Sequence, residues 1–427
     1  METNLTLSNP KRRRATRGGW ADLFPYYAGY PEEFATAVLN SARLRRNAYV
    51  YDPWNGSGST TSAAAALGLR ASGIDINPVM VVVARARLLP SSEWSSLRPL
   101  SRRIIQHART LATDGEADEL TAWFDSETTV HVRRLERSIC EHLVEADEVD
   151  APLDHLSALA STFYVALFSA VRSLCWKFRT SNPTWLRAAT DPSQLLTYSR
   201  SEVEHRFLDA VERARSTCRA GSLTSKAGSR VRIDVADATR TRPRKNSVDL
   251  VLTSPPYCTR IDYTAATRVE LAVLSRLARV TRSDLSAKML GSIRVPKKFP
   301  RKRASWGPTA ASFLTKVETH PSHASDTYYL KSHLDYFSKL FASLSQCAAA
   351  LRPGGAALLV VQDSRYKGIH NDLQAVVSEM MDGLGLPLAQ RSDFSFARSM
   401  RDVNSRSLSY GIDGAVRESA LLFRKET

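Results

Sequence analysis

The sequence has few cysteines and no long apolar run, and both shortages exclude whole classes of protein. Its 427 residues include five cysteines, none of them in a Cys-x-x-Cys pair. Such spacing predicts neither a structural zinc site nor the disulfide framework of a small secreted protein. No segment approaches the roughly 18 apolar residues of a membrane-spanning helix, and the amino terminus lacks the apolar core of a secretory signal. We therefore expect a cytoplasmic protein with no membrane partner and no metal.

Acidic residues are also scarce relative to basic ones. The chain contains 59 Lys and Arg against 43 Asp and Glu, which gives a formal net charge of +16. An excess of this size favours a polyanionic partner, and nucleic acid is the first candidate. An acidic membrane surface is the alternative explanation of the charge. The content of 43% hydrophobic and 24% charged residues predicts a folded chain with one elaborated domain or two.

Strand-like and helical segments alternate in two separate stretches of the chain. Residues 1–20 are polar and basic, and we expect a flexible tail there. Residues 21–91 and 221–427 carry the alternation, which predicts one α/β domain built from both stretches. The expected strands are residues 48–51, a segment ending at 75, and residues 231–235, 248–253, 356–362, 386–396 and 419–424. We predict a seven-stranded mixed sheet with helices on both faces, in which the last two strands pair antiparallel at one edge.

Two stretches interrupt this alternation. Residues 92–220 show helical periodicity and predict a helical insertion between the second and third strands. Residues 281–325 contain four prolines, and the part from Arg282 to Arg303 has eight basic residues against one acid. This composition predicts an irregular basic loop inserted in the α/β domain.

A glycine-rich turn follows the first strand, where an open α/β sheet binds nucleotide-like ligands. It runs Asp-Pro-Trp-Asn-Gly-Ser-Gly-Ser-Thr-Thr from Asp52 to Thr61. Gly56 and Gly58 allow a tight turn and a close approach to a ligand, and Asp52 can accept hydrogen bonds from a cationic amine. The turn lacks the lysine of a phosphate-binding P-loop, and Thr61 replaces the third glycine of a dinucleotide fingerprint. An ordinary glycine turn is the alternative when this motif is taken alone.

Acidic residues stand at the ends of the next two strands. Asp75 lies 17 residues after Gly58, close to the spacing at which an acid binds ribose hydroxyls in such folds. This spacing favours an adenosine-containing ligand. Asp237 follows the third strand, where it can meet an adenine amine, although aspartate is also common there as a turn former.

Ser-Pro-Pro-Tyr, from Ser254 to Tyr257, follows the apolar strand 248–253. Two prolines cannot continue a strand ladder, so they fix the backbone and orient the residues on either side. Ser254 supplies acceptor oxygens and Tyr257 an aromatic face, which are the groups needed to act on the exocyclic amine of an extruded base. A proline-terminated strand with a packed tyrosine is the alternative. The glycine-rich turn on the same predicted sheet argues against it.

Together these motifs resemble those of the S-adenosylmethionine-dependent amino-group DNA methyltransferases. The turn from Asp52 is similar to their motif I, Asp75 and Asp237 to the acids of motifs II and III, and Ser254-Pro-Pro-Tyr257 to motif IV. The segment Phe24-Pro-Tyr-Tyr27 is a weaker likeness of motif X, which packs against the methionine end of the cofactor.

The resemblance covers about residues 21–89 and 231–425 and implies a class I methyltransferase (Rossmann-like) fold with S-adenosylmethionine as cofactor. Leu351-Arg-Pro-Gly-Gly355 resembles a loop that precedes a strand in many such enzymes. The implied cofactor-binding residues are Tyr26, Asp52, Pro53, Asn55, Gly56, Gly58, Thr60, Asp75, Ile76, Asp237 and Ala238.

The same resemblance implies direct methyl transfer to a flipped base in double-stranded DNA, with Ser254, Pro255, Pro256 and Tyr257 as the catalytic residues. The Ser-Pro-Pro-Tyr spelling implies the N4 of cytosine, whereas Asp- or Asn-Pro-Pro-Tyr usually marks the N6 of adenine. N6-adenine and RNA amine methylation stay open as alternatives, and a catalytically silent DNA-binding module is a further one. Cys258 follows Tyr257 and is not the Pro-Cys nucleophile of carbon-5 methylation. We expect a bacterial or archaeal, nucleoid-associated enzyme with a restriction or phage-defence partner.

The chain departs from the family because motifs I and IV are almost 200 residues apart. The helical insertion is therefore the candidate target-recognition region, where Trp176, Lys177 and Arg179 combine cations with an aromatic ring. Packing in the core of the insertion is the alternative for its aromatic residues. A second set of expected DNA contacts, with a solvated surface as its alternative, is Lys297, Lys298, Arg301, Lys302 and Arg303.

Overall fold

The computed structural model describes most of the chain. The described residues are 5, 7–11, 20–25, 29–112, 118–144, 153, 156–182, 184–220, 228–258, 262–292, 294, 300–396 and 416–426. Within these ranges no helix combines the length and the apolar character needed to cross a membrane.

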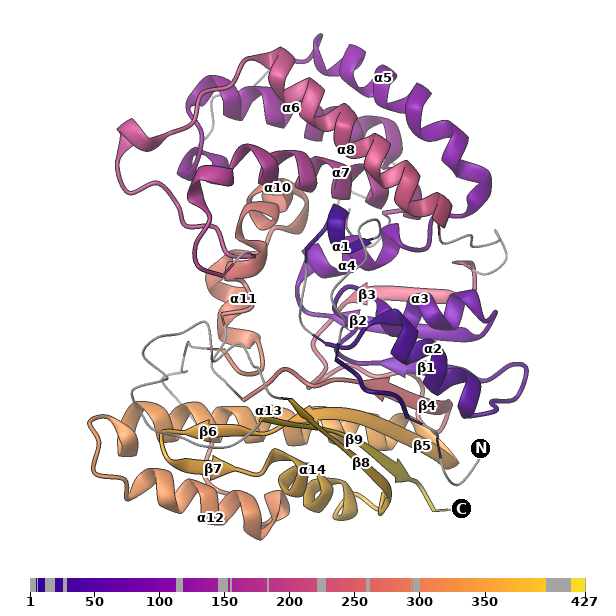
Figure 1. The fold of residues 1–427 in the computed structure, drawn as a ribbon, viewed down its shortest axis with the longest axis vertical. Coiled ribbons are helices and arrows are strands. Elements are labelled where there is room, and N and C mark those ends of the chain that lie inside the picture. The colour runs from indigo at the N-terminus through magenta and orange to yellow at the C-terminus, as the bar shows by residue number, and fades with distance from the viewer. Residues whose placement is uncertain are drawn as a thin grey trace.

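Seven strands form one sheet in the order β3-β2-β1-β4-β5-β9-β8 (Figure 1). They are β1 (Tyr49–Asp52), β2 (Arg70–Asp75), β3 (Val231–Val235), β4 (Val248–Thr253), β5 (Leu351–Gln362), β8 (Leu388–Phe396) and β9 (Val416–Arg424). The first five are parallel neighbours, while β9 runs antiparallel to β5 and β8 antiparallel to β9. The predicted seven-stranded mixed sheet with its antiparallel edge pair is confirmed, and its strand order is that of a class I methyltransferase.

Helices cover both faces of the sheet because consecutive strand residues point to opposite sides. On one face α2 (Glu32–Ser41) and α3 (Ser59–Ala66) pack against a row formed by Val50, Leu250 and Ala356. On the other face α13 (Leu330–Ala350) and α14 (Leu373–Asp382) pack against the next row, which is Tyr51, Val251 and Ala357. The central strands therefore consist of apolar residues on both faces, which is the pattern of a buried parallel sheet.

A lobe of four long helices lies between β2 and β3 in the sequence. Its helices are α5 (Leu97–Ala108), α6 (Ser126–Leu143), α7 (Ala158–Leu174) and α8 (Arg200–Ala220). The central helix, α7, packs against α6, α8, α4 (Pro78–Ala86) and α10 (Arg268–Ala278). One hydrophobic core runs through these elements, so the lobe is continuous with the α/β part (Figure 1).

The shorter elements complete the chain. They are α1 (Trp20–Leu23), α11 (Arg282–Lys288), α12 (Gly307–Glu318), the hairpin strands β6 (Ser364–Tyr366) and β7 (Ile369–Asn371), a π-helical turn at Ser325–Tyr329, and 3₁₀ turns at Ser91–Ser96, Glu119–Ala122, Trp176–Phe178, Pro192–Gln194, Ala265–Thr267 and Ala304–Trp306. The sequence patterns did not predict the β6–β7 hairpin.

The irregular conformation predicted for residues 281–325 is wrong in two places. Thr281 caps α11 by accepting a hydrogen bond from the backbone N–H of Asp284. Pro308 stands in the first turn of α12, where its missing N–H leaves no helical bond unmade. This helix also buries Phe313 and Leu314, so it belongs to the core.

The segment Leu351–Gly355 is likewise part of β5 and does not form a separate loop before it. Its pairing with β4 shifts register between Val248 and Leu250, and Gly354 adopts a φ of 69° there. The irregularity is therefore a bulge within the strand.

A buried ion pair ties the helical lobe to α10. Arg172 of α7 donates to both carboxylate oxygens of Glu270, at 2.6 and 2.9 Å, and to the carbonyl oxygens of Thr184 at 2.9 Å and Ala266 at 2.6 Å. The Glu270 side chain has no exposed surface. One guanidinium therefore joins three segments, and each charge depends on the other for its solvation.

Replacing either partner alone, in Arg172→Leu or Glu270→Leu, should lower the free energy of unfolding by about 3 to 5 kcal/mol, because the remaining charge stays buried without a partner. The double variant should recover a large part of that loss, and urea denaturation monitored by circular dichroism measures all three. Breaking the exposed Arg98–Glu212 pair by Arg98→Ala is the control and should have little effect. A double variant as unstable as the sum of the two single variants would contradict the interpretation.

Candidate functional site

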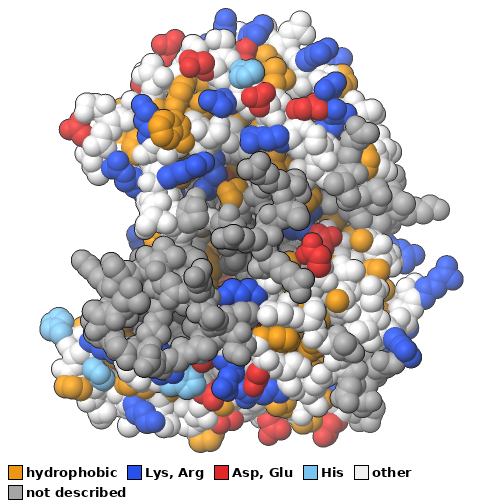
Figure 2. Space-filling view, viewed as in Figure 1, with side chains coloured by type: hydrophobic (Ala, Val, Ile, Leu, Met, Phe, Trp, Pro, Cys, Tyr) orange, Lys and Arg blue, Asp and Glu red, His pale blue; other side chains and the backbone are white. Residues whose placement is uncertain are grey.

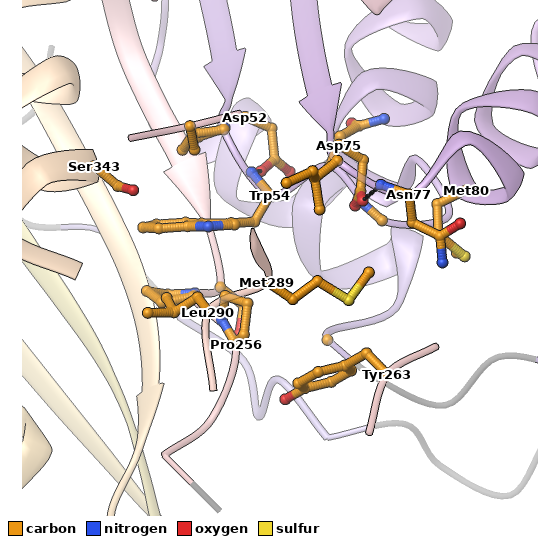
Figure 3. A pocket seen from close by; sticks show the side chains of 18 of the residues that line it. Asp52, Trp54, Asp75, Asn77, Met80, Pro256, Tyr263, Met289, Leu290 and Ser343 are labelled. Atoms are coloured by element: carbon orange, nitrogen blue, oxygen red, sulfur yellow. Dashed lines mark hydrogen bonds between the residues drawn. The ribbon is translucent and has the colours of Figure 1, made fainter. Parts of the chain in front are cut away.

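A pocket lies at the carboxyl ends of β1, β2, β3 and β4 (Figure 3). Its lining includes Asp52 at the end of β1, Asp75 at the end of β2, Ala236–Thr239 after β3 and Ser254–Tyr257 after β4. Because neighbouring parallel strands end at one edge, segments about 200 residues apart in the chain meet here.

The glycine-rich turn has the backbone shape that its sequence predicts. Gly56 and Gly58 adopt φ angles of 48° and 86°, in the left-handed region that favours glycine. A Cβ on Gly58 would also lie 2.8 Å from the Cβ of Ala84 in α4. Gly56 lines the pocket, whereas Gly58 lies behind it and permits the close approach of α3 to α4.

Asp52 forms the centre of a buried polar network, with 3% of its surface exposed. The Thr60 hydroxyl donates to one carboxylate oxygen at 2.6 Å, while the Thr253 hydroxyl and the backbone N–H of Trp54 donate to the other. Since the single hydroxyl hydrogen of Thr60 is used, Tyr30 donates to Thr60 Oγ1 at 2.6 Å. Burial raises the pKa of Asp52 to about 6, against the lowering effect of the bonds from Thr253 and Thr60.

Asp75 joins the turn to β2. Its carboxylate accepts hydrogen bonds from the backbone N–H groups of Gly56 at 3.0 Å and Asn77 at 2.8 Å. Burial raises its pKa to about 6 as well. Two carboxylates with raised pKa values thus line one pocket, an arrangement that a bound cation or hydroxyl group would stabilise.

Asp237 lines the same pocket from the segment after β3. One of its oxygens accepts from the backbone N–H of Thr239 at 2.9 Å and from the Thr239 hydroxyl at 2.7 Å. Asp237 therefore stabilises a turn, as the alternative interpretation expected, and it also lines the pocket in which an adenine amine could bind.

Hydrogen bonds hold the Ser-Pro-Pro-Tyr segment from three sides. Tyr336 of α13 donates to the carbonyl oxygen of Pro256 at 2.9 Å, and the backbone N–H of Tyr257 donates to the Tyr263 hydroxyl at 3.0 Å. The Tyr257 hydroxyl donates to Glu418 of β9 at 2.8 Å. All four residues of the segment line the pocket, and Tyr257 is half-buried.

Several lining residues were not predicted from the sequence. They are Gly29, Tyr30, Trp54, Ser57, Ser59, Asn77, Met80, Ala236, Thr239, Tyr263, Lys288, Met289, Leu290 and Ser343. Trp54 lies inside the glycine-rich motif, so its position there was an available signal. Met289 follows α11 and carries no motif; Figure 3 shows its side chain between Asp75 and Tyr263.

The remaining predicted residues fall into two groups. Pro53, Asn55, Thr60, Ile76 and Ala238 line the pocket, as do the acids described above, whereas Tyr26, Lys297 and Lys298 lie outside the described residues.

The described members of the two basic clusters lie away from the pocket. Trp176 is 56% exposed beside exposed Lys177 and Arg179, while the adjacent Phe178 is buried. The alternative of core packing thus applies to Phe178 and not to Trp176. Arg301, Lys302 and Arg303 are exposed, and Lys302 forms an ion pair with Glu318 at 2.6 Å. Contact of either cluster with DNA remains a prediction.

No protein-family model matches the chain, and no curated protein matches it. Solved structures with a similar course of the chain include an S-adenosylmethionine-dependent methyltransferase from Methanosarcina mazei, at 7% identity and a TM-score of 0.31 over 91% of this chain and 97% of that one. A second is the rRNA methyltransferase aviRa from Streptomyces viridochromogenes, at 13% identity and a TM-score of 0.27 over 97% of this chain and 96% of that one. A third is a geranyl diphosphate methyltransferase, at 8% identity and a TM-score of 0.33 over 92% of this chain and 77% of that one. Similarity at this level carries no argument about substrate, and the fold rests on the strand order.

Proposed function

We propose that the protein is an S-adenosylmethionine-dependent methyltransferase that modifies an exocyclic amine of a flipped base in DNA, with the N4 of cytosine as the first candidate. One observation carries the proposal. The glycine-rich turn with Asp52, the strand-end acid Asp75 and the Ser254-Pro-Pro-Tyr257 segment line a single pocket.

The pocket residues fit an S-adenosylmethionine molecule. Asp52 and Asp75 supply carboxylates for a ligand that carries a sulfonium and an ammonium charge. The side-chain nitrogen of Asn55 is buried in the turn without a hydrogen-bond partner among the described residues, so an acceptor on a ligand would satisfy it. Asp75 would hold the ribose, and Ile76, Asp237 and Ala238 the adenine.

The chemistry of the Ser-Pro-Pro-Tyr segment suits an amine substrate. When bound, S-adenosylmethionine supplies an electrophilic methyl group. The lone pair of a base amine is delocalised into the ring, so the nitrogen must become more tetrahedral before it can attack. The Ser254 hydroxyl oxygen and the Ser254 and Pro255 carbonyls would accept its hydrogens and favour that geometry, while Tyr257 would stack on the base.

Charge is divided along the pocket in a way that favours an anionic substrate. The inner lining holds Asp52 and Asp75, whereas exposed Lys288, at the end of α11, is the one Lys or Arg among the described lining residues. Figure 2 shows Lys and Arg side chains, interspersed with Asp and Glu, on one face of the helical lobe. A cationic cofactor and a phosphate-bearing substrate would match this division.

Nucleoside mass spectrometry after incubation of DNA with labelled cofactor tests the proposal and should detect N4-methylcytosine. The Asp75→Ala variant is the control and should incorporate much less label. Detection of N6-methyladenine would change the proposed target base from cytosine to adenine. Label found in RNA alone would change the proposed substrate from DNA to RNA. Tight cofactor binding without any methylated nucleic acid would favour the silent DNA-binding module, although its intact motifs argue against that outcome.

Cofactor affinity should rise between pH 5 and pH 7. Burial raises the pKa values of Asp52 and Asp75 to about 6, so both are mostly neutral at pH 5 and mostly ionised at pH 7. The ionised Asp52 attracts a cation, and the ionised Asp75 is the stronger acceptor for ribose hydroxyl groups. Asp75→Asn should weaken binding at pH 7 by about 1.5 to 3 kcal/mol and flatten the pH dependence. Isothermal titration calorimetry measures both quantities, with Asp191→Asn, an exposed aspartate of the helical lobe, as the control. An affinity independent of pH would remove both carboxylates from the cofactor site.

Lys288→Ala should weaken DNA binding and reduce the slope of log affinity against log salt by about 0.9, the contribution of one neutralised phosphate. Cofactor affinity should change little, because the Lys288 side chain is exposed to solvent and its positive charge does not attract a cationic cofactor. Lys316→Ala, at an exposed lysine of α12 outside the pocket lining, is the matched control. Equal slopes for Lys288→Ala and wild type would show that Lys288 contacts no phosphate.

A further inference from the structure

The Tyr257 side chain and backbone are restrained at three points. Its backbone N–H donates to the Tyr263 hydroxyl and its own hydroxyl donates to Glu418. Its carbonyl oxygen lies against Gly291, where a Cβ would approach it to 2.8 Å and where φ is 75°. Tyr257 is nevertheless one of the residues that line the pocket.

Glu418 occupies an unusual position for a carboxylate. It lies in β9, opposite Gln362 of β5 and Phe394 of β8, and 7% of its surface is exposed. It accepts a hydrogen bond from the Tyr257 phenol at 2.8 Å. Burial raises the pKa of Glu418, against the lowering effect of this bond and of the charge on Lys11. Burying a carboxylate is costly, so packing alone does not account for it.

The adjacent residue, Ser419, does not take part in this bond. Ser419 points to the other side of β9, where its hydroxyl donates to Asp393 of β8 at 2.6 Å. The Glu418–Tyr257 bond therefore connects the antiparallel edge of the sheet to the motif after β4, 161 residues away in the chain.

We propose that Glu418 is a positioning residue that sets the plane of the Tyr257 ring, so that its face meets the extruded base in line with methyl transfer. Stacking requires a defined ring plane. A hydrogen bond at the far end of the ring fixes the direction of the ring axis, and because a phenol O–H prefers to lie in the plane of its ring, the acceptor also favours one ring plane. This inference rests on the proposed function, because it assigns Tyr257 the base-stacking role.

A double-mutant cycle with Glu418→Leu and Tyr257→Phe tests the proposal. Each single variant should lower kcat on DNA roughly tenfold, the effect of one lost hydrogen bond to a charged group. The Tyr257→Phe/Glu418→Leu variant should be no slower than the worse single variant, because both changes remove the bond between Tyr257 and Glu418, although Tyr257→Phe also removes the bond between Tyr257 and Ser254. Glu418→Gln keeps an acceptor oxygen and should restore most of kcat, while the KM for S-adenosylmethionine should stay constant throughout.

Two controls separate positioning from a general loss of structure. Asp393→Asn changes a carboxylate on the neighbouring strand that does not contact Tyr257, and it should leave kcat unchanged. Thermal unfolding of every variant reports its stability, and the fluorescence of 2-aminopurine at the target position reports base extrusion. Glu418→Leu should reduce that signal even in preparations that are fully folded.

The outcomes distinguish this inference from the function on which it rests. A wild-type protein that methylates no nucleic acid would overturn both. A wild type active on nucleic acid, combined with additive losses in the cycle or with a Glu418→Leu variant as active as wild type, would overturn the role of Glu418 alone.

Discussion

The parallel pairing of β2, β1 and β4 is the constraint on which the site depends. Parallel neighbours place all of their carboxyl ends at one edge, so Asp52, Asp75 and Ser254 meet although 202 residues separate the first from the last. The apolar rows on both faces hold these strands in register. A shift of one residue would turn each strand-end side chain to the opposite face.

Burial gives the pocket its chemical character. Asp52 and Asp75 lie in a low-dielectric environment, and each carboxylate keeps its place through hydrogen bonds from the turn. Because burial raises their pKa values to about 6, both are ionised at neutral pH at an energetic cost that a cationic ligand would offset. A pocket built in this way is better suited to a charged adenosine derivative than to a neutral metabolite.

The helical lobe packs against α10, which follows the Ser-Pro-Pro-Tyr segment in the chain. The Arg172 guanidinium bonds to Glu270 in that helix and to the carbonyl of Ala266 just before it. It also holds the carbonyl of Thr184, near exposed Trp176 and Arg179. A contact between DNA and the lobe would therefore be transmitted to α10, the helix that follows the Ser-Pro-Pro-Tyr segment proposed to bind the base.

Local sequence determined much of this architecture. Largely apolar runs that end close to an aspartate or a proline indicated the five parallel strands. Asn77-Pro78 indicated the start of α4, where Asn77 accepts a hydrogen bond from the backbone N–H of Val79. The motifs also specified most of one side of the pocket, because strand ends can be inferred from periodicity and turn residues.

Tertiary structure alone decided the other parts. Met289, Leu290 and Lys288 come from a stretch whose prolines and charges predicted an irregular loop, and only packing on α13 and Tyr257 brings them to the pocket. Glu418 carries no local signal either, since an acid in an apolar strand is unremarkable until its partner is known. Hydrophobic periodicity depends on neighbours along the chain, whereas a hydrogen bond across 161 residues depends on how the strands are ordered in space.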